Sequence, residues 1–284
     1  MQPLIATLAG DGRPETEIGN PVESRDLTPP PAPSGHRARL RLQTEQALLA
    51  AAYAEIREHG AVALSLRRVA RRVGMSPAGL YRYVASRDDL LTQVITASYH
   101  GLADHLSAAI GALDERVQPR EDDAPPPLVA GPTCELGDRL RAVALAYRDW
   151  GVTHPQEFTL VFGDPVPGYA APPGGPTVAA MGRVGAALGR PLLEAWDTGR
   201  LRIPAGWRAA AADDDTAGRL AGMGVLDGHE LPPPVGAALL LAWGRLHGQV
   251  SLEVFGHHRW LFPDGCATLY DGEVTALVEQ LLAA

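Results

Sequence analysis

The chain has 284 residues, 46% of them hydrophobic, and a net charge of −8 at neutral pH, which is enough for two domains with a sizeable core. No apolar run approaches the roughly 20 residues that span a bilayer. The N-terminus lacks the basic start and apolar stretch of a secretory signal. Two cysteines are too few for a disulfide framework or a metal cluster. We therefore expect a soluble cytoplasmic protein with no metal and no membrane partner.

The first 35 residues are predicted to form a disordered tail, because they are rich in proline, glycine and threonine and show no helical period. The basic residues that follow are expected to form a flexible arm: His36, Arg37, Arg39 and Arg41. A first helix is predicted over residues 43–59, ended by Gly60. Its apolar stripe consists of Leu48, Ala51, Ala52 and Ile56.

Residues 65–84, SLRRVARRVGMSPAGLYRYV, predict a helix-turn-helix. Ser65 is suited to cap a first helix, Gly74 tolerates the left-handed backbone of a tight helix exit, and Ser76 begins a second helix. Leu80 and Val84 are expected to point to the core. The outward face of the second helix then consists of Pro77, Ala78, Gly79, Arg82 and Tyr83. Two short helices joined by a turn of about 3–4 residues place the second helix in a DNA major groove.

Charge supports a DNA-binding segment at this position. Between His36 and Arg87 the sequence has ten arginines against three glutamates, a net charge of +7, which leaves −15 for the rest of the chain. A phosphate-seeking segment on an acidic body is typical of a DNA-binding domain joined to another function. The alternative is a solvated arginine face with no nucleic-acid partner.

The remainder of the chain shows only helical periodicity. Ser86 is expected to cap a helix over about 87–113, and further helices are predicted over about 137–153, 155–163, 176–197, 234–257 and 271–283, with a kink at Pro191. The proline-rich residues 117–133 predict a mobile loop, and one hypothesis makes it the gate of a ligand pocket. Residues 199–231 are expected to be irregular, with Asp213 to Asp215 as solubilising charge.

These elements predict an all-α fold with two domains after the tail. An N-terminal three-helix helix-turn-helix DNA-binding domain is expected over residues 36–90. A helical ligand-binding and dimerisation domain is expected over residues 91–284.

Aromatic residues are concentrated in the second predicted domain. Five of the sixteen in the chain fall within 23 residues: Tyr147, Trp150, Phe158, Phe162 and Tyr169. With Met181 and Trp196 they are expected to line an apolar cavity for a flat or apolar small molecule. An ordinary aromatic core explains the same pattern equally well.

The last two predicted helices carry a candidate dimer interface. Trp243 and His247 share a helix face because they are four residues apart, and Gly248 lets a neighbouring backbone approach closely. The rest of the expected four-helix interface consists of Leu239, Leu246, Val250, Val254, Leu277, Val278 and Leu281. His247 is interpreted as a structural histidine, with a ligand-sensing or metal-binding role as the alternative. His257 and His258 are interpreted as solvated.

Residues 44–91 resemble the N-terminal DNA-binding domain of TetR-type transcriptional regulators. The matching residues are Leu48, Ala51, Ala52, Ile56, Gly60, Ser65, Val69, Ala70, Gly74, Met75, Ser76, the run from Gly79 to Tyr83 and the run from Ser86 to Leu91. Val84 departs from the pattern, because the family usually has phenylalanine there. The C-terminal half is similar to a TetR subgroup with a Trp-His-Gly signature, here Trp243, His247 and Gly248, and the stretch from Tyr147 to Tyr169 is similar to it as well.

The resemblance implies a homodimeric regulator that binds an inverted-repeat double-stranded DNA operator, is released by a small-molecule effector and needs no cofactor. Ala78, Gly79 and Arg82 are expected near base edges, and Arg82 is able to make a bidentate contact to guanine. The other expected DNA contacts are Arg39, Arg41, Thr44, Ser65, Ser76, Pro77, Tyr81, Tyr83 and Arg87. The basic arm is expected in the minor groove. Core packing is the alternative for Tyr81, and activation is the alternative to repression.

Two other functions fit parts of the sequence. One is a dimeric DNA-binding or architectural protein without a small-molecule ligand, and the other is a helical enzyme or carrier. The sequence has no nucleophile elbow, Walker loop, dinucleotide fingerprint or zinc-ligand spacing. Enzymatic activity is therefore not expected.

Overall fold

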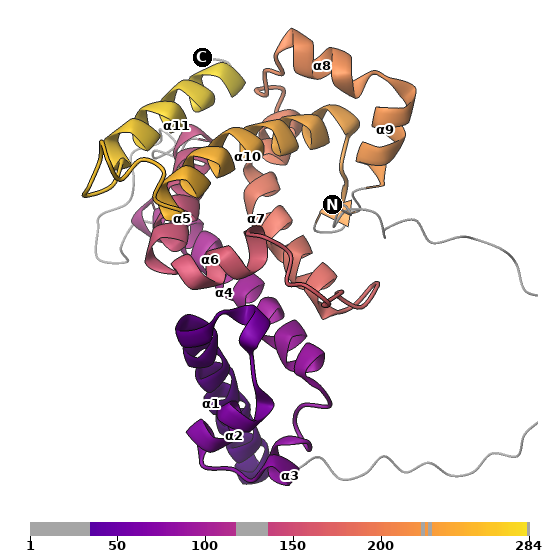
Figure 1. Ribbon diagram of the computed structural model, residues 1–284. Coiled ribbons are helices and arrows are strands. Elements are labelled where there is room, and N and C mark those ends of the chain that lie inside the picture. The colour runs from indigo at the N-terminus through magenta and orange to yellow at the C-terminus, as the bar shows by residue number, and fades with distance from the viewer. Residues whose placement is uncertain (1–34, 118–135, 223–224, 227–228, 283–284) are drawn as a thin grey trace, which may run out of the picture. The chain divides into compact units, whose positions relative to one another are not determined.

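The computed structural model describes residues 35–117, 136–222, 225–226 and 229–282 (Figure 1). Most of the predicted tail and nearly all of the predicted 117–133 loop, with its gate hypothesis, lie outside the described residues. The chain divides into two units, residues 1–94 and 95–284, and helix α4 (Arg87–Val117) runs across the division in sequence. The domain boundary expected after residue 90 falls four residues before it.

The first unit holds the predicted helix-turn-helix. Its elements are α1 (Gly35–His59), the 3₁₀ helix η1 (Ala61–Ala63), α2 (Leu66–Val73), α3 (Pro77–Leu80) and the start of α4. The apolar stripe predicted on α1 packs into a core whose most buried members include Leu48, Ala52, Val69, Leu80, Val84 and Leu90. Val84 is therefore a core residue even though it is smaller than the phenylalanine usual at that position.

Helix α1 begins at Gly35, well before its predicted start at residue 43. The expectation of a flexible basic arm is therefore wrong, because the backbone of residues 36–41 is helical. The reason is local, since arginine, leucine and glutamine are good helix formers. In addition, Arg41 pairs with Glu45 one turn later, with 2.9 Å between Nε and Oε1.

The second unit is a helical bundle. After α4 come α5 (Leu136–Thr153), α6 (Pro155–Phe162), α7 (Pro176–Asp197), α8 (Ala205–Ala211), α9 (Asp214–Ala221), α10 (Pro233–Val254) and α11 (Ala267–Leu281). Between α9 and α10, β1 (Val225–Leu226) and β2 (His229–Glu230) form an antiparallel hairpin with Val225 opposite Glu230. The predicted all-α class is confirmed, and α7 is unbroken across Pro191.

The expectation that residues 199–231 are irregular is wrong, because α8, α9 and the hairpin lie there. Asp213 caps α9, and its Oδ1 accepts a hydrogen bond from the Thr216 amide at 2.9 Å. The acidic run therefore starts a helix and is not merely solubilising charge. Leu220 of α9 and Ala211 of α8 are buried with Ala237 of α10, so these short helices cover the start of α10.

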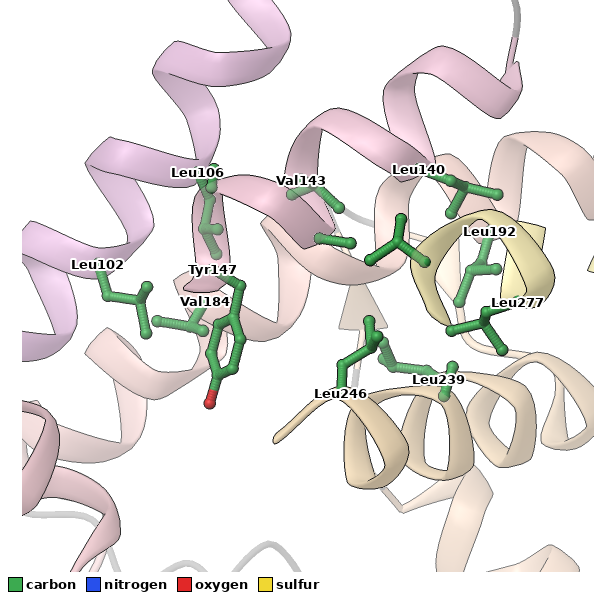
Figure 2. Close-up of a cluster of buried hydrophobic side chains, with 14 of the residues drawn as sticks. Leu102, Leu106, Leu140, Val143, Tyr147, Val184, Leu192, Leu239, Leu246 and Leu277 are labelled. Carbon is green, nitrogen blue, oxygen red and sulfur yellow. The ribbon is translucent and has the colours of Figure 1, made fainter. Parts of the chain in front are cut away.

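The core of the second unit is centred on α5, which packs against α7, α10 and α11. Figure 2 shows side chains from α4, α5, α7, α10 and α11 gathered in one apolar cluster, with Tyr147 projecting from α5 among leucines and valines. This packing decides which faces of α10 and α11 are buried within the chain and which are left at the surface.

Candidate functional site

The turn of the helix-turn-helix is fixed by Gly74 and Ser76. Gly74 ends α2 in the left-handed region with a φ of 72°, and the Ser76 Oγ accepts a hydrogen bond from the Gly79 amide at 3.1 Å, so both residues act as predicted. Ser65 does not, because its side chain makes no cap hydrogen bond at the start of α2. Leu80 anchors the short recognition helix α3 in the core.

The outward side of α3 presents Pro77, Ala78 and Gly79, but the helix ends at Leu80, so Arg82 and Tyr83, expected on the same helix, lie in the turn that follows it. Pro77, Ala78 and Arg82 are exposed, while Gly79 and Tyr83 are partly covered. A Cβ atom added at Gly79 would lie 3.3 Å from the Ser76 Oγ and 4.0 Å from an Arg82 Nη atom, so the glycine leaves room where the cap and the guanidinium meet. Tyr81 is 58% exposed, which rules out the alternative that it is a core residue.

Several arginines of this unit form ion pairs or hydrogen bonds with other residues of the same unit. Arg68 and Arg72 pair with Glu55 and Glu58 of α1. Arg87 donates hydrogen bonds to the carbonyl oxygens of Ala61 at 3.0 Å and of Val62 at 2.9 Å. These contacts tie α2 and α4 to α1 and η1. Arg87, expected as a phosphate contact, therefore first of all holds the fold together.

Glu55 is the buried centre of this charge network. Its side chain is inaccessible to solvent and faces Arg68, Arg72 and His59. Burial by itself would raise the pKa of Glu55, but the hydrogen bond and positive charge of Arg68 outweigh burial, and the pKa of this carboxyl lies below its ordinary value. The carboxylate is consequently ionised at neutral pH, as the arginines around it require.

Two arginines that sequence reasoning left out of the candidate site are exposed on α2. Arg67 and Arg71 are four residues apart, so they lie on one helix face, and neither makes an ion pair among the described residues. Arg68 and Arg72, one position along, face α1 instead. The helical periodicity of α2 indicates which arginines are exposed, because Val69 and Ala70 mark the buried side of the helix.

Thr44 and Arg41, also expected at DNA, have intrahelical partners. The Thr44 hydroxyl donates to the Leu40 carbonyl at 2.9 Å, and Arg41 pairs with Glu45. Arg39 is exposed on the same helix.

The second unit contains an apolar cavity of about 50 Å³. Its walls come from α5, α7, α10 and α11, and the lining residues are Leu140, Val143, Ala144, Tyr147, Leu188, Leu192, Leu239, Ala242, Trp243, Leu246, Val274, Leu277, Val278 and Leu281. Of the seven residues predicted to line a ligand pocket, only Tyr147 is among them. Trp150 stacks on His154 instead, and Trp196 is 39% exposed at the end of α7.

Six residues predicted for the dimer interface line this cavity instead: Leu239, Trp243, Leu246, Leu277, Val278 and Leu281. Val250 is fully buried in the same core, and Val254 packs against it. The side chains of Leu239, Leu246, Leu277 and Leu281 are buried within the chain and offer little surface to a partner, whereas Trp243, Val254 and Val278 are partly exposed. Gly248 is different, since it is exposed and nothing lies within 4 Å of the position of a Cβ.

His247 lies inside an aromatic cluster. Its Nδ1 is 2.7 Å from the Tyr147 hydroxyl and its Nε2 is 3.2 Å from the Ser251 hydroxyl. The ring stacks on Trp243 at 4.7 Å and on Phe158 at 5.6 Å between centroids. Burial lowers the pKa of His247, so the imidazole is neutral at pH 7. This geometry favours the structural interpretation of the histidine.

The predicted pocket aromatics are divided between the His247 cluster and its surroundings. Phe162 lies 5.0 Å from the His247 ring and 6.2 Å from the Tyr99 ring, whereas Met181 packs at the edge of the core. Tyr169 is partly buried. His258, expected to be solvated, has its Nδ1 3.7 Å from the Cys266 sulfur, and His257 is exposed.

The outward faces of α10 and α11 have no covering element within the described chain. Their exposed small and apolar residues are Leu241, Gly244, Gly248 and Leu252 on α10, and Leu269, Gly272 and Ala276 on α11. The Arg245–Glu273 ion pair and the exposed Glu279 and Gln280 lie beside them. We call this surface the α10–α11 face. Nothing lies within 4 Å of a Cβ at Gly244, Gly248 or Gly272, so packing within the chain does not require glycine at these helical positions.

Two negative findings concern the described residues only. No helix among them is long and apolar enough to cross a membrane. Nor do they bring together three or more histidine, cysteine, aspartate or glutamate side chains in a group able to hold a metal ion.

Comparison with known proteins matches both units. A model described as "Bacterial regulatory proteins, tetR family" matches residues 48–94, and one described as "Tetracyclin repressor-like, C-terminal domain" matches residues 140–277. The HTH-type transcriptional regulators Rv1816 of Mycobacterium tuberculosis and Mb1846 of Mycobacterium bovis are each 31% identical over 251 residues, which is 87% of this chain and 96% of theirs.

Solved structures give the same picture. The regulatory protein SCO4313 is 29% identical with a TM-score of 0.59, over 86% of this chain and 98% of that one. A protein of unknown function from Rhodococcus sp. RHA1, 18% identical, has a TM-score of 0.56 over 84% of this chain and 96% of that one, which shows a likeness of fold alone.

Proposed function

Because the chain belongs to the TetR family of transcriptional regulators, we propose that it acts in the cytoplasm as a homodimer that binds an inverted-repeat DNA operator and is released from it by a small-molecule effector. The proposal of DNA binding rests on the exposed face of α3, which the Ser76 cap and the buried Leu80 hold in place. Two such helices related by two-fold symmetry reach successive major grooves when they are about 34–36 Å apart.

Arg82 is the proposed sequence-reading residue. Its guanidinium is exposed at the end of α3, with Ala78 on the same outward side. A bidentate contact of arginine to the O6 and N7 atoms of guanine discriminates by about 1–3 kcal/mol, and alanine favours contact with a thymine methyl group. Gly79 allows the helix backbone to approach the bases closely.

Arg67 and Arg71 are the proposed phosphate contacts, together with the exposed residues Ser76 and Tyr81. In a helix-turn-helix the first helix crosses the DNA backbone, and α2 presents these two arginines on its free face. Such contacts set register and affinity without reading sequence. Arg87 acts mainly by fixing η1 against α4.

The α10–α11 face is the proposed dimer interface. Glycine inside a helix costs roughly 1 kcal/mol relative to alanine, and three glycines on this face have no contact within the chain that explains them. A partner helix that packs closely against them supplies the reason. The predicted four-helix arrangement is retained, but with the outward stripe of α10 and α11 in place of the buried one.

The apolar cavity behind α10 is the proposed starting point of effector binding. It is much smaller than the roughly 300–1,000 Å³ of drug-sized ligand pockets, so an effector has to displace lining side chains such as Leu239 or Leu246. These residues lie on the reverse side of the helix that carries Gly244 and Gly248. A coupling of about 1–3 kcal/mol between effector and dimer geometry changes operator affinity ~5–150-fold.

Selection of genomic DNA fragments by the purified full-length protein at about 0.15 M salt, followed by footprinting, tests the operator. An enriched inverted repeat with two protected half-sites is the expected result. Binding without sequence enrichment overturns the proposal in favour of an architectural DNA-binding protein.

Effector binding is tested separately by thermal shift against a panel of apolar metabolites. A ligand at 100 times its dissociation constant stabilises the native state by about 2.7 kcal/mol. The same compounds must then release the footprinted DNA. Stabilisation without release contradicts the coupling.

A further inference from the structure

Trp260, in the segment that joins α10 to α11, is 82% exposed, and its neighbour Leu261 is 56% exposed. We call residues 255–266 the Trp260 loop. Tryptophan at the surface of a folded protein is characteristic of binding surfaces, because it brings a large apolar area at a small cost in side-chain entropy. The function described above makes no use of this residue.

The Trp260 loop is fastened at both ends by one carboxylate. The Glu253 Oε2 accepts a hydrogen bond from the Arg148 Nε at 2.7 Å, and the Glu253 Oε1 accepts one from the Cys266 amide at 3.0 Å. Arg148 and Glu253 are both largely buried. A Cβ at Gly265 would lie 2.8 Å from the Glu253 Oε1, so this closure requires glycine. The buried ion pair therefore joins α5, the end of α10 and the start of α11.

The interior of the loop is also built from hydrogen bonds. Gly256, with a φ of 77°, turns the chain away from α10. The amides of Leu261 and Phe262 donate to the His258 carbonyl at 3.0 Å and 2.8 Å. The backbone that carries Trp260 is thus held by hydrogen bonds. The loop therefore loses little conformational entropy when a partner covers Trp260.

The exposed apolar surface of the loop is continuous in sequence with the α10–α11 face. Leu252 near the end of α10 and Leu269 near the start of α11 are exposed on either side of it, and Phe255 is exposed at its first position. A stable interface buries about 800 Å² per partner with 20–30 residues a side, and a face built around three glycines and an alanine supplies little area per residue. A tryptophan adds about 150–250 Å² when it is buried.

We propose that the Trp260 loop is an arm that each subunit places on the second copy of this chain, so that the dimer interface extends beyond α10 and α11 to the loop of both subunits. Two-fold symmetry makes the contact reciprocal, with each Trp260 covered by the partner. This inference rests on the proposed homodimer and specifies its main apolar anchor.

Sedimentation velocity of the full chain over a dilution series tests the proposal. The variants are Trp260→Ala, Gly248→Leu on the α10–α11 face, and Val62→Ala as a control that removes an exposed apolar side chain from the first unit. Trp260→Ala is expected to raise the dimer dissociation constant at least tenfold, with an unchanged helical circular dichroism spectrum and melting temperature of the monomer. Val62→Ala is expected to change nothing.

Tryptophan fluorescence gives a second readout that does not depend on affinity. The wild-type emission minus that of Trp260→Phe isolates the signal of Trp260, which is expected to shift to shorter wavelength as the protein is concentrated through the dissociation constant. A Trp260 signal that stays solvent-like in the dimer overturns the arm.

The two variants separate this inference from the proposed function. If Gly248→Leu weakens the dimer and Trp260→Ala does not, the α10–α11 interface stands and the arm is wrong. If neither variant changes the dissociation constant, or the wild type is a monomer at every concentration, the interface and the arm both fail.

Discussion

At the level of single residues, arginines of equal charge have different roles in the first unit. Arg68 and Arg72 neutralise the buried Glu55, while Arg82 is exposed with no ion pair among the described residues. A charge count of the segment cannot separate the two groups, because both contribute one positive charge per residue. Burial and partners separate them.

Arg82→Ala is expected to lower the preference for operator over scrambled DNA by about 1–3 kcal/mol per half-site, because no side chain of α3 itself can make a bidentate guanine contact in its place. Binding to scrambled DNA should change little. Fluorescence anisotropy with both DNAs at one salt concentration measures the difference. Arg219→Ala, an exposed arginine on α9, serves as the control, and an equal loss on both DNAs would show that Arg82 contacts phosphate only.

Glu55→Gln is expected to lower the free energy of unfolding of the first unit by about 2–3 kcal/mol, because it leaves the charges of Arg68 and Arg72 without their buried partner. Urea denaturation at pH 7 checks this value. Glu58→Gln, which removes an exposed carboxylate that pairs with Arg72, should cost much less.

Glu55 also makes the stability of the first unit depend on pH. Since the pKa of Glu55 is lower in the folded state than in the unfolded state, its contribution to stability is complete above the ordinary pKa of glutamate, about 4.3. It is lost as the pH falls through the lowered folded-state value. The difference in stability between wild type and Glu55→Gln should therefore narrow in acid, and a difference that widens there would contradict the assignment.

At the level of elements, each face of α2 has its own function. Val69 and Ala70 face the core, Arg68 and Arg72 face α1, and the remaining side presents Arg67 and Arg71. Helix α10 is divided in the same way between the cavity and the α10–α11 face. One helix can therefore connect a ligand on its inner side with a partner on its outer side.

The double variant Arg67→Ala/Arg71→Ala is expected to weaken binding to all DNA sequences to the same extent. The slope of log K against log salt concentration should become shallower by about two, since each phosphate contact contributes about 0.9. A titration at several salt concentrations with operator and scrambled DNA measures both effects. An unchanged slope would remove these arginines from the interface.

At the level of the whole molecule, the proposed dimer combines two weak half-site contacts into specific binding of one operator. Inserting five base pairs between the half-sites rotates one of them by about half a turn of the DNA helix. Binding to this DNA is expected to fall to that of a single half-site, as measured by gel shift with both operators. Gly248→Leu should bind both operators equally, because a monomer does not sense the spacing.

Local patterns in the sequence were sufficient to predict the elements that depend on near neighbours in the chain. The Gly74 exit, the Ser76 cap, the apolar stripe of α1 and the bounds of α5, α6 and α7 all follow from residues within a few positions of each other. The same patterns supported the all-α class and, by resemblance, the TetR family. Asp213 carries a capping signal for α9 in addition to its charge.

Only the tertiary structure decided which face of each helix is used. Leu246 and Gly248 are two residues apart on α10, and periodicity assigned both to one interface. The fold places Leu246 at the cavity and Gly248 at the surface. The partners of Arg68 and Arg87 were equally beyond the sequence, because they lie 13 to 26 positions away. The sequence shows that a hydrophobic side chain has to be buried or that a buried charge has to be paired. Which residues bury or pair it depends on how distant segments of the chain pack.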